Sequence, residues 1–112
     1  MPNECSNRFV LACSNAEEFN TVVERELTHD NITIDLLGAR AVKFTQVTAR
    51  QPDYEFLERL ISNYPHCWIK NEWIEEGGTA GVWIGNVNGI QSLSWQDMSL
   101  EEHHALFQPP LH

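Results

Sequence analysis

Apolar residues recur along this chain with two different periods, and the order of those periods limits the folds that it can adopt. Residues 7–13 alternate apolar side chains, which is typical of a strand. Residues 19–27 carry theirs at the 3, 4 and 8 spacing of a buried helical stripe, and the charged residues beside the stripe, including Glu17 and Glu18, are expected to face water. Ser14 precedes Glu17 by three residues, so we predict that they form a capping box at the start of a helix that ends near His29.

The next three segments are predicted to be two strands and a helix. Residues 31–37 and 40–48 alternate like strands, and Gly38 between them suits a tight hairpin turn. Pro52 is favoured at a first helical position, and the apolar spacing after it predicts a second amphipathic helix that Pro65 ends.

Two further strands are predicted at residues 66–76 and 79–87, joined by a Gly-Gly hairpin turn. The order strand, helix, strand, strand, helix, strand predicts an α+β fold, a ferredoxin-like split β-α-β sandwich. The strand at 79–87 is then an extra C-terminal hairpin strand. Ser99 and Glu102 form another capping box, which predicts a short terminal helix. The apolar stripes of these elements predict a core of Phe9, Leu11, Phe19, Val22, Val23, Leu27, Ile32, Ile34, Val42, Phe44, Leu57, Leu60, Ile61 and Ile69.

The length of 112 residues predicts one domain over 1–112, with residues 88–112 as a C-terminal extension packed on it. No apolar run approaches the ~18 residues of a membrane helix, and the N-terminal residues lack the pattern of a signal peptide. We therefore expect a cytoplasmic protein that does not bind membranes.

Charge is the unusual part of the composition. The formal net charge is −9, and residues 71–112 contain six acids without any Lys or Arg. Nucleic-acid affinity comes largely from Lys and Arg contacts to phosphates, so direct DNA or RNA binding is disfavoured. A basic protein surface would attract this chain electrostatically. The competing interpretation is that the charge only keeps a small protein soluble.

No group of residues predicts catalysis, a cofactor or a metal. The three cysteines lack C-x-x-C spacing and are interpreted as reduced, buried thiols. His66 and Cys67 are adjacent, and adjacent side chains of a strand point to opposite faces. His103 and His104 are also adjacent, whereas zinc-binding helices place their histidines four residues apart. We expect a protein that is not an enzyme and that works without metal.

Several short motifs carry a resemblance to a known family. The chain opens with Met-Pro-Asn-Glu-Cys-Ser-Asn-Arg at residues 1–8, has Tyr64-Pro65 after its second predicted helix, and has an acidic glycine turn at residues 75–78. Together these motifs resemble the YubB-like proteins, a ferredoxin-like family carried by plasmids and phages. Members often have an aromatic residue where Glu4 stands here, and residues 88–112 lie outside the resemblance. The resemblance implies a ferredoxin-like fold and a mobile-element origin, without any catalytic residue.

The preferred functional hypothesis is an acidic protein-interaction module that acts as a monomer or homodimer. Its expected partner is a host nucleic-acid-handling or defence protein with a basic surface, which it would inhibit in the manner of anti-restriction or anti-CRISPR proteins. The alternative is a small-molecule-sensing ferredoxin-like regulatory domain, which depends on fold analogy. Trp is enriched in binding hot spots, so we expect Trp73 or Trp95 to be exposed among the acids. Trp83 and Trp68 are instead expected in the core. The expected partner-binding residues are Glu72, Trp73, Glu75, Glu76, Trp95, Glu101 and Glu102. The first three acids are expected to lie where no Lys or Arg neutralises them, and Glu101 and Glu102 to form a second patch.

Overall fold

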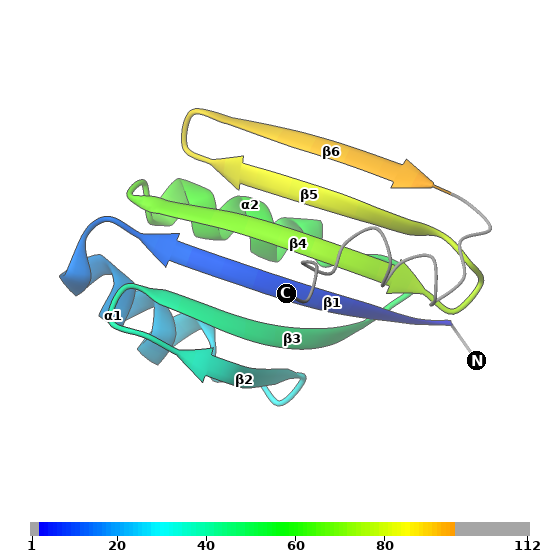
Figure 1. Ribbon diagram of the computed structural model, residues 1–112, viewed down its shortest axis with the longest axis horizontal. Coiled ribbons are helices and arrows are strands. Elements are labelled where there is room, and N and C mark those ends of the chain that lie inside the picture. The colour runs from blue at the N-terminus through cyan, green and yellow to red at the C-terminus, as the bar shows by residue number, and fades with distance from the viewer. Residues whose placement is uncertain (1–2, 96–112) are drawn as a thin grey trace, which may run out of the picture.

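The computed structural model describes residues 3–95, and of Trp95 it describes only the backbone (Figure 1). The terminal helix predicted from Ser99, and with it Glu101 and Glu102, lies outside the described residues. The described elements are β1 (Glu4–Cys13), α1 (Ala16–Glu26), β2 (Ile32–Leu37), β3 (Ala41–Ala49), α2 (Tyr54–Asn63), β4 (Cys67–Glu75), β5 (Ala80–Asn86) and β6 (Gly89–Trp95).

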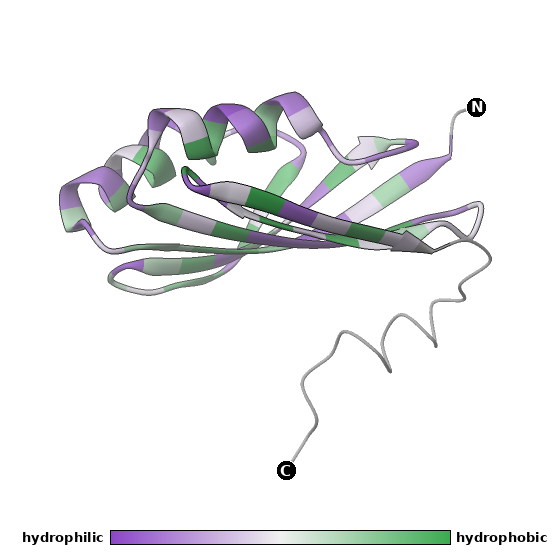
Figure 2. Ribbon diagram, turned by 90° about the horizontal axis from the view of Figure 1, so that it is seen from above, coloured by the Kyte–Doolittle hydropathy of each residue, from purple (hydrophilic) through white to green (hydrophobic). Residues whose placement is uncertain are grey.

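All six described strands form one antiparallel sheet in the order β2-β3-β1-β4-β5-β6. β1 is central, and its Phe9 lies opposite Phe44 of β3 on one side and Asn71 of β4 on the other. Both helices lie against the same face of this sheet (Figure 2). The predicted α+β class is therefore confirmed. Within residues 3–95, neither helix is long and apolar enough to cross a membrane.

The two predicted hairpins form where the glycines predict them. Gly38 donates its N–H to the carbonyl of Ala41 at 2.8 Å, which closes the turn between β2 and β3. Gly78 has φ of 104° in the turn between β4 and β5, a conformation that costs glycine little because it has no Cβ.

β6 was not predicted as a strand. Its residues are polar and glycine-containing, so they lack the alternation that marks a half-buried strand. The backbone N–H of Asn88 donates to Oδ1 of Asn86 at 2.8 Å, and this turn brings β6 back along β5. The strand lies at the edge of the sheet, where the pattern of side chains is only weakly constrained.

The helices begin and end close to the predicted positions. α1 is capped by Asn15 rather than by the predicted Ser14, since Oδ1 of Asn15 accepts a hydrogen bond from the backbone N–H of Glu18. It ends at Glu26, with Leu27 as the C-cap. α2 begins at Tyr54 and is capped by Asp53, whose side chain accepts from the backbone N–H of Phe56, so Pro52 precedes the cap and does not take the predicted first helical position.

The core lies between the helices and the face of the sheet that they cover. Two predicted core residues, Val23 and Ile32, are only partly buried against it. The prediction for Ile34 is wrong because this side chain is 40% exposed on the edge strand β2, at the border of the sheet. The other predicted core residues are confirmed as buried: Phe9, Leu11, Phe19, Val22, Leu27, Val42, Phe44, Leu57, Leu60, Ile61 and Ile69.

Candidate functional site

The face of the sheet opposite the helices is left uncovered by the described elements (Figure 2). We call this surface the open face. Strand alternation puts Val10, Trp68, Val82, Ile84 and Leu93 on it, since their neighbours along each strand point toward the helices. Trp68 is 37% exposed and Leu93 is 67% exposed. Large apolar side chains therefore reach solvent on a surface that a soluble protein would ordinarily cover or use for binding.

Glu72 lies on the open face, but it is not an unneutralised acid as predicted. Its carboxylate pairs with the Lys70 ammonium at 2.9 Å. Residues two apart on a strand share a face, which is the physical reason for this contact. Lys70 therefore neutralises Glu72 and weakens the attraction of this carboxylate for a basic partner.

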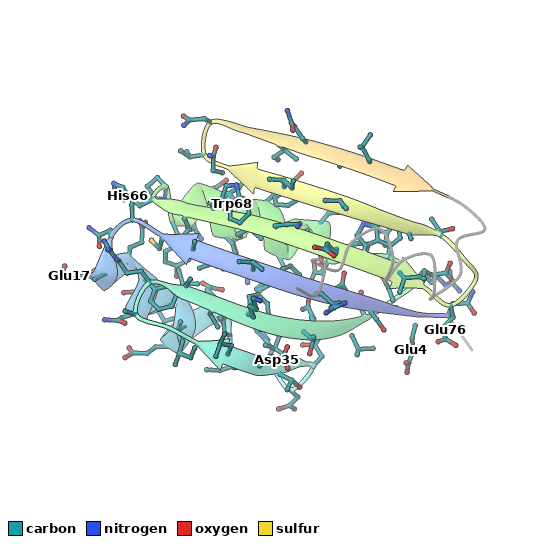
Figure 3. All side chains as sticks on the ribbon, viewed as in Figure 1. Glu4, Glu17, Asp35, His66, Trp68 and Glu76 are labelled. Carbon is teal, nitrogen blue, oxygen red and sulfur yellow. The ribbon has the colours of Figure 1, made fainter. Side chains whose placement is uncertain are left out.

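Glu75 and Glu76 lie at the predicted hairpin end, and the fold adds a third acid to them. The backbone N–H of Glu4 donates to Oε1 of Glu76 at 2.6 Å, and the N–H of Glu76 donates to the carbonyl of Glu4 at 3.0 Å. Figure 3 shows Glu4 and Glu76 at the same end of the sheet, opposite the end that carries His66 and Trp68. We call Glu4, Glu75 and Glu76 the acidic turn.

The predicted roles of two tryptophans are reversed. Trp73 was expected to be an exposed anchor, yet it is 6% exposed on the helix-covered face, opposite Gly81. Trp68, which was expected in the core, is the exposed one. The sequence could have distinguished them. Ile69 was predicted to be buried, and Trp73, four residues along the same strand, points to the same face, whereas the adjacent Trp68 points to the opposite face. The predicted burial of Trp83 is confirmed at 3% exposure.

Of the remaining predicted contacts, Trp95 is described only as the last backbone position of β6. Glu101 and Glu102 lie outside the described residues, so their predicted role stays a prediction.

A second group of chemically active side chains lies at the other end of β1. The thiols of Cys13 and Cys67 and the carboxylate of Glu18 lie within 4.8 Å of one another. Cys13 and Cys67 are direct cross-strand partners, and Glu18 comes from the first turn of α1. We call these three residues the thiol cluster.

Glu18 Oε2 is the centre of the contacts in this region. It accepts hydrogen bonds from the Cys13 thiol at 3.4 Å and from the backbone N–H of His66 at 2.8 Å. Nδ1 of His66 is 3.2 Å from the same oxygen. Burial raises the pKa of the Cys67 thiol, and the hydrogen bond with Cys13 and the nearby charges raise it further. This cluster was not predicted, because Glu18 was expected to face water.

The third thiol, Cys5, is separate from the cluster. It lies near the other end of β1, opposite Thr48 and Glu75. All three thiols are free and buried, as the sequence predicted.

Two hollows in the described surface have the size of ligand pockets. One, of about 530 Å³, lies beside the connection from β3 to α2 and is lined by Asn31, Thr48, Gln51, Asp53 and Tyr54 among others. The other, of about 500 Å³, is lined by residues of β5 and β6, including Val82, Ile84 and Leu93.

The chain was compared with protein-family models, curated proteins and solved structures. No family model, no curated protein and no solved structure matches this chain.

Proposed function

We propose that this protein is a protein-interaction module whose open face is its contact surface. The observation that carries the proposal is the exposed Trp68, which shares this face with Val82, Ile84 and Leu93. Tryptophan is among the residues that most often dominate binding energies. The hollow of about 500 Å³ on β5 and β6 gives a partner side chain a place to insert beside them.

The partner that suits this chain has a basic surface. The net charge of −9 favours such a partner at long range. The acidic turn of Glu4, Glu75 and Glu76 supplies three carboxylates at one end of the sheet, which add to this attraction. Charges at the rim of an interface chiefly set the association rate, while the apolar centre sets dissociation.

The class of partner is a host protein that handles nucleic acid or takes part in defence, which this module would inhibit. Such proteins carry basic surfaces for phosphates, and an acidic module competes for them without binding nucleic acid itself. The resemblance of residues 1–8 and 75–78 to the YubB-like family supports a plasmid or phage origin. The proposed location is the host cytoplasm, where such enzymes work.

We further infer that the fold is ferredoxin-like, with β5 and β6 added to one edge. In support, β1, α1, β2, β3, α2 and β4 follow one another in the chain, while the strands lie in the order β2-β3-β1-β4. Each helix then connects two strands that have a third between them, which is the split β-α-β arrangement.

A site-specific cross-linking experiment tests the contact surface. A photoreactive residue at position 68 should cross-link a discrete host protein, whereas the same residue at Asn20, exposed on α1, should not. The captured protein is then purified, and Trp68→Ala should weaken its binding while Asn20→Ala leaves it unchanged. Equal capture from both positions, or wild-type affinity of Trp68→Ala, would show that the open face is not the contact surface.

The alternative function, a small-molecule sensor, is favoured by one observation. The hollow beside the connection from β3 to α2 measures about 530 Å³, which falls within the usual range of about 300 to 1,000 Å³ for ligand sites. Its lining includes Thr48, Asp53 and Tyr54, which offer polar contacts. A metabolite screen read by thermal unfolding tests it: a sensor should be stabilised by one ligand class, and Asp53→Asn should abolish that shift.

A further inference from the structure

The thiol cluster assembles its side chains from three places that are far apart in the sequence. Cys13 ends β1, Glu18 lies in the first turn of α1, and Cys67 begins β4. The register of the sheet makes the two cysteines direct partners, so their separation is set by the backbone rather than by side-chain flexibility.

The spacing of the cluster allows tetrahedral coordination after a small adjustment of the side chains. Zinc–sulfur bonds of about 2.3 Å at tetrahedral angles hold two sulfur ligands about 3.8 Å apart. The ligand atoms of Cys13, Glu18 and Cys67 all lie within 4.8 Å of one another, so a shift of about an ångström or less brings each into bonding range of a shared ion.

His66 lies beside the cluster and is the candidate for a fourth ligand, but its ring must turn toward the thiols to bind, because, of the described residues, only Cys13, Glu18 and Cys67 have ligand atoms that all lie within 4.8 Å of one another. Its Nδ1 is 3.2 Å from Oε2 of Glu18. The backbone N–H and carbonyl of His66 are both hydrogen-bonded to residues at the start of α1 or just before it. The N–H of His66 donates to Glu18 Oε2 at 2.8 Å, and its carbonyl accepts from the N–H of Ser14 at 3.1 Å. Because β4 begins only at Cys67, His66 is in the turn before the strand, and the rule that adjacent strand residues face opposite sides does not apply to it.

The donor set indicates which metal would bind. Thiolates and imidazole select zinc and other soft or borderline ions, while magnesium and calcium prefer oxygen alone. Two thiolates, one imidazole and one carboxylate give four ligands, the usual number in a structural zinc site.

We propose that Cys13, Glu18 and Cys67 bind a zinc ion, with the His66 imidazole as the fourth ligand. On binding, each thiol releases one proton to solvent, and the Cys13–Glu18 hydrogen bond is replaced by two bonds to the metal. The ion then ties the start of α1 and the turn before β4 to the end of β1. The expectation that no metal binds came from sequence spacing, and spacing does not detect ligands that three separate elements bring together.

Two simpler states use the same side chains. In one, Glu18 only accepts hydrogen bonds that hold the turn at His66. In the other, Cys13 and Cys67 lose two electrons and two protons to an oxidant such as molecular oxygen and form a disulfide. A metal titration, supported by a thiol assay, separates both from zinc binding.

The full chain, purified under reducing conditions and stripped with a chelator, is titrated with cobalt(II) and then with zinc. We expect one equivalent of cobalt, a thiolate-to-cobalt absorption band, and displacement by one equivalent of zinc. Cys13→Ser and Cys67→Ser should each abolish the band, and Glu18→Gln and His66→Ala should weaken zinc binding by about tenfold or more.

Matched controls come from the same chain. Cys5→Ser removes the thiol at the other end of β1, and Glu17→Gln changes the exposed neighbour of Glu18, so both should bind cobalt as the wild type does. If the cysteine variants do not fold, Glu18→Gln and His66→Ala carry the test, because both side chains reach solvent. The proposal is overturned by binding below one equivalent, by a band that survives in Cys13→Ser or is lost in Cys5→Ser, or by thiol counts that reveal a Cys13–Cys67 disulfide in the reduced preparation.

Discussion

Phe9 of β1 and Phe44 of β3 lie directly opposite each other with their rings stacked, the centroids 4.5 Å apart and the planes 5° apart. Both are buried, at 2% and 1% exposure. Because β1 is the central strand, this pair joins the β2–β3 hairpin to the part of the core that α2 and β4 complete.

Truncation of this pair should be costly. Phe44→Ala removes the stacked ring and leaves a cavity, so we expect a loss of about 3 to 5 kcal/mol in the free energy of unfolding, measured by urea denaturation. Lys43→Ala, one residue away on the open face, is the control and should change stability by less than about 0.5 kcal/mol. A loss below about 1 kcal/mol for Phe44→Ala would contradict the observed packing.

Gly81 is required by the packing of Trp73. A Cβ at position 81 would lie 2.6 Å from the carbonyl oxygen of Leu93 and 2.7 Å from Cε2 and Cζ2 of Trp73. Gly81→Ala should therefore cost about 1 to 3 kcal/mol through forced repacking. Gly89→Ala is the control, since a Cβ there meets nothing within 4 Å. Thermal unfolding of the two variants gives the comparison, and equal melting temperatures would refute it.

Local patterns predicted most of the fold because each element has a local cause. The period of two in residues 7–13 indicates a strand, and the helical spacing in residues 19–27 indicates a helix, without reference to the rest of the chain. Gly38 likewise indicates a turn from its own position. β6 and Ile34 were mispredicted because both lie at sheet edges, where burial depends on which element covers the strand. That coverage is a property of the tertiary arrangement, which periodicity does not contain.

The candidate sites were less predictable than the fold. The hairpin end at Glu75 and Glu76 was predicted, but Glu4 reaches it only through the pairing of β1 with β4. The thiol cluster likewise depends on the register that sets Cys13 opposite Cys67. The register between strands that are distant in sequence follows from the whole sheet, so residue spacing gave no indication that Glu4 joins the acidic turn or that the thiol cluster forms.

The cap of α1 distinguishes two neighbouring residues. The sequence pattern favoured Ser14, but Oδ1 of Asn15 accepts from the N–H of Glu18 at 2.9 Å. Asn15→Ala should cost about 1 kcal/mol, while Ser14→Ala should stay within about 0.5 kcal/mol of the wild type. Urea denaturation of both variants measures this, and the reverse ranking would restore Ser14 as the cap.

Cys5 should make stability depend on pH above neutrality. Burial, aided by the charge of Glu75 and opposed by a hydrogen bond from Thr48, raises the pKa of the Cys5 thiol from its ordinary value of 9.0 to about 11. Between these values the unfolded chain loses this proton and the folded chain keeps it, so stability present below pH 9 is lost as the pH rises toward 11. The limiting slope for one proton is about 1.4 kcal/mol per pH unit.

The comparison of wild type with Cys5→Ala isolates this group from other titrating side chains. We expect the free energy of unfolding of the variant to fall less steeply from pH 9 to 11, and the two curves to run parallel from pH 6 to 8. Parallel curves over the whole range would mean that Cys5 ionises equally in the folded and unfolded states.

Trp68 and Trp73 should separate binding from stability. Trp73 is buried against Gly81, so Trp73→Ala should lower the free energy of unfolding by about 3 to 5 kcal/mol. Trp68 stands partly exposed on the open face, so Trp68→Ala should cost less than about 1 kcal/mol in stability but weaken partner binding by about 2 kcal/mol, as a hot-spot residue does. Trp68→Phe should also lower the fraction of fluorescence that acrylamide quenches, whereas Trp73→Phe should raise it. If instead Trp68→Ala unfolds the chain and Trp73→Ala spares it, the two faces of β4 have been assigned in reverse, and the interaction surface must be sought on the side of the helices.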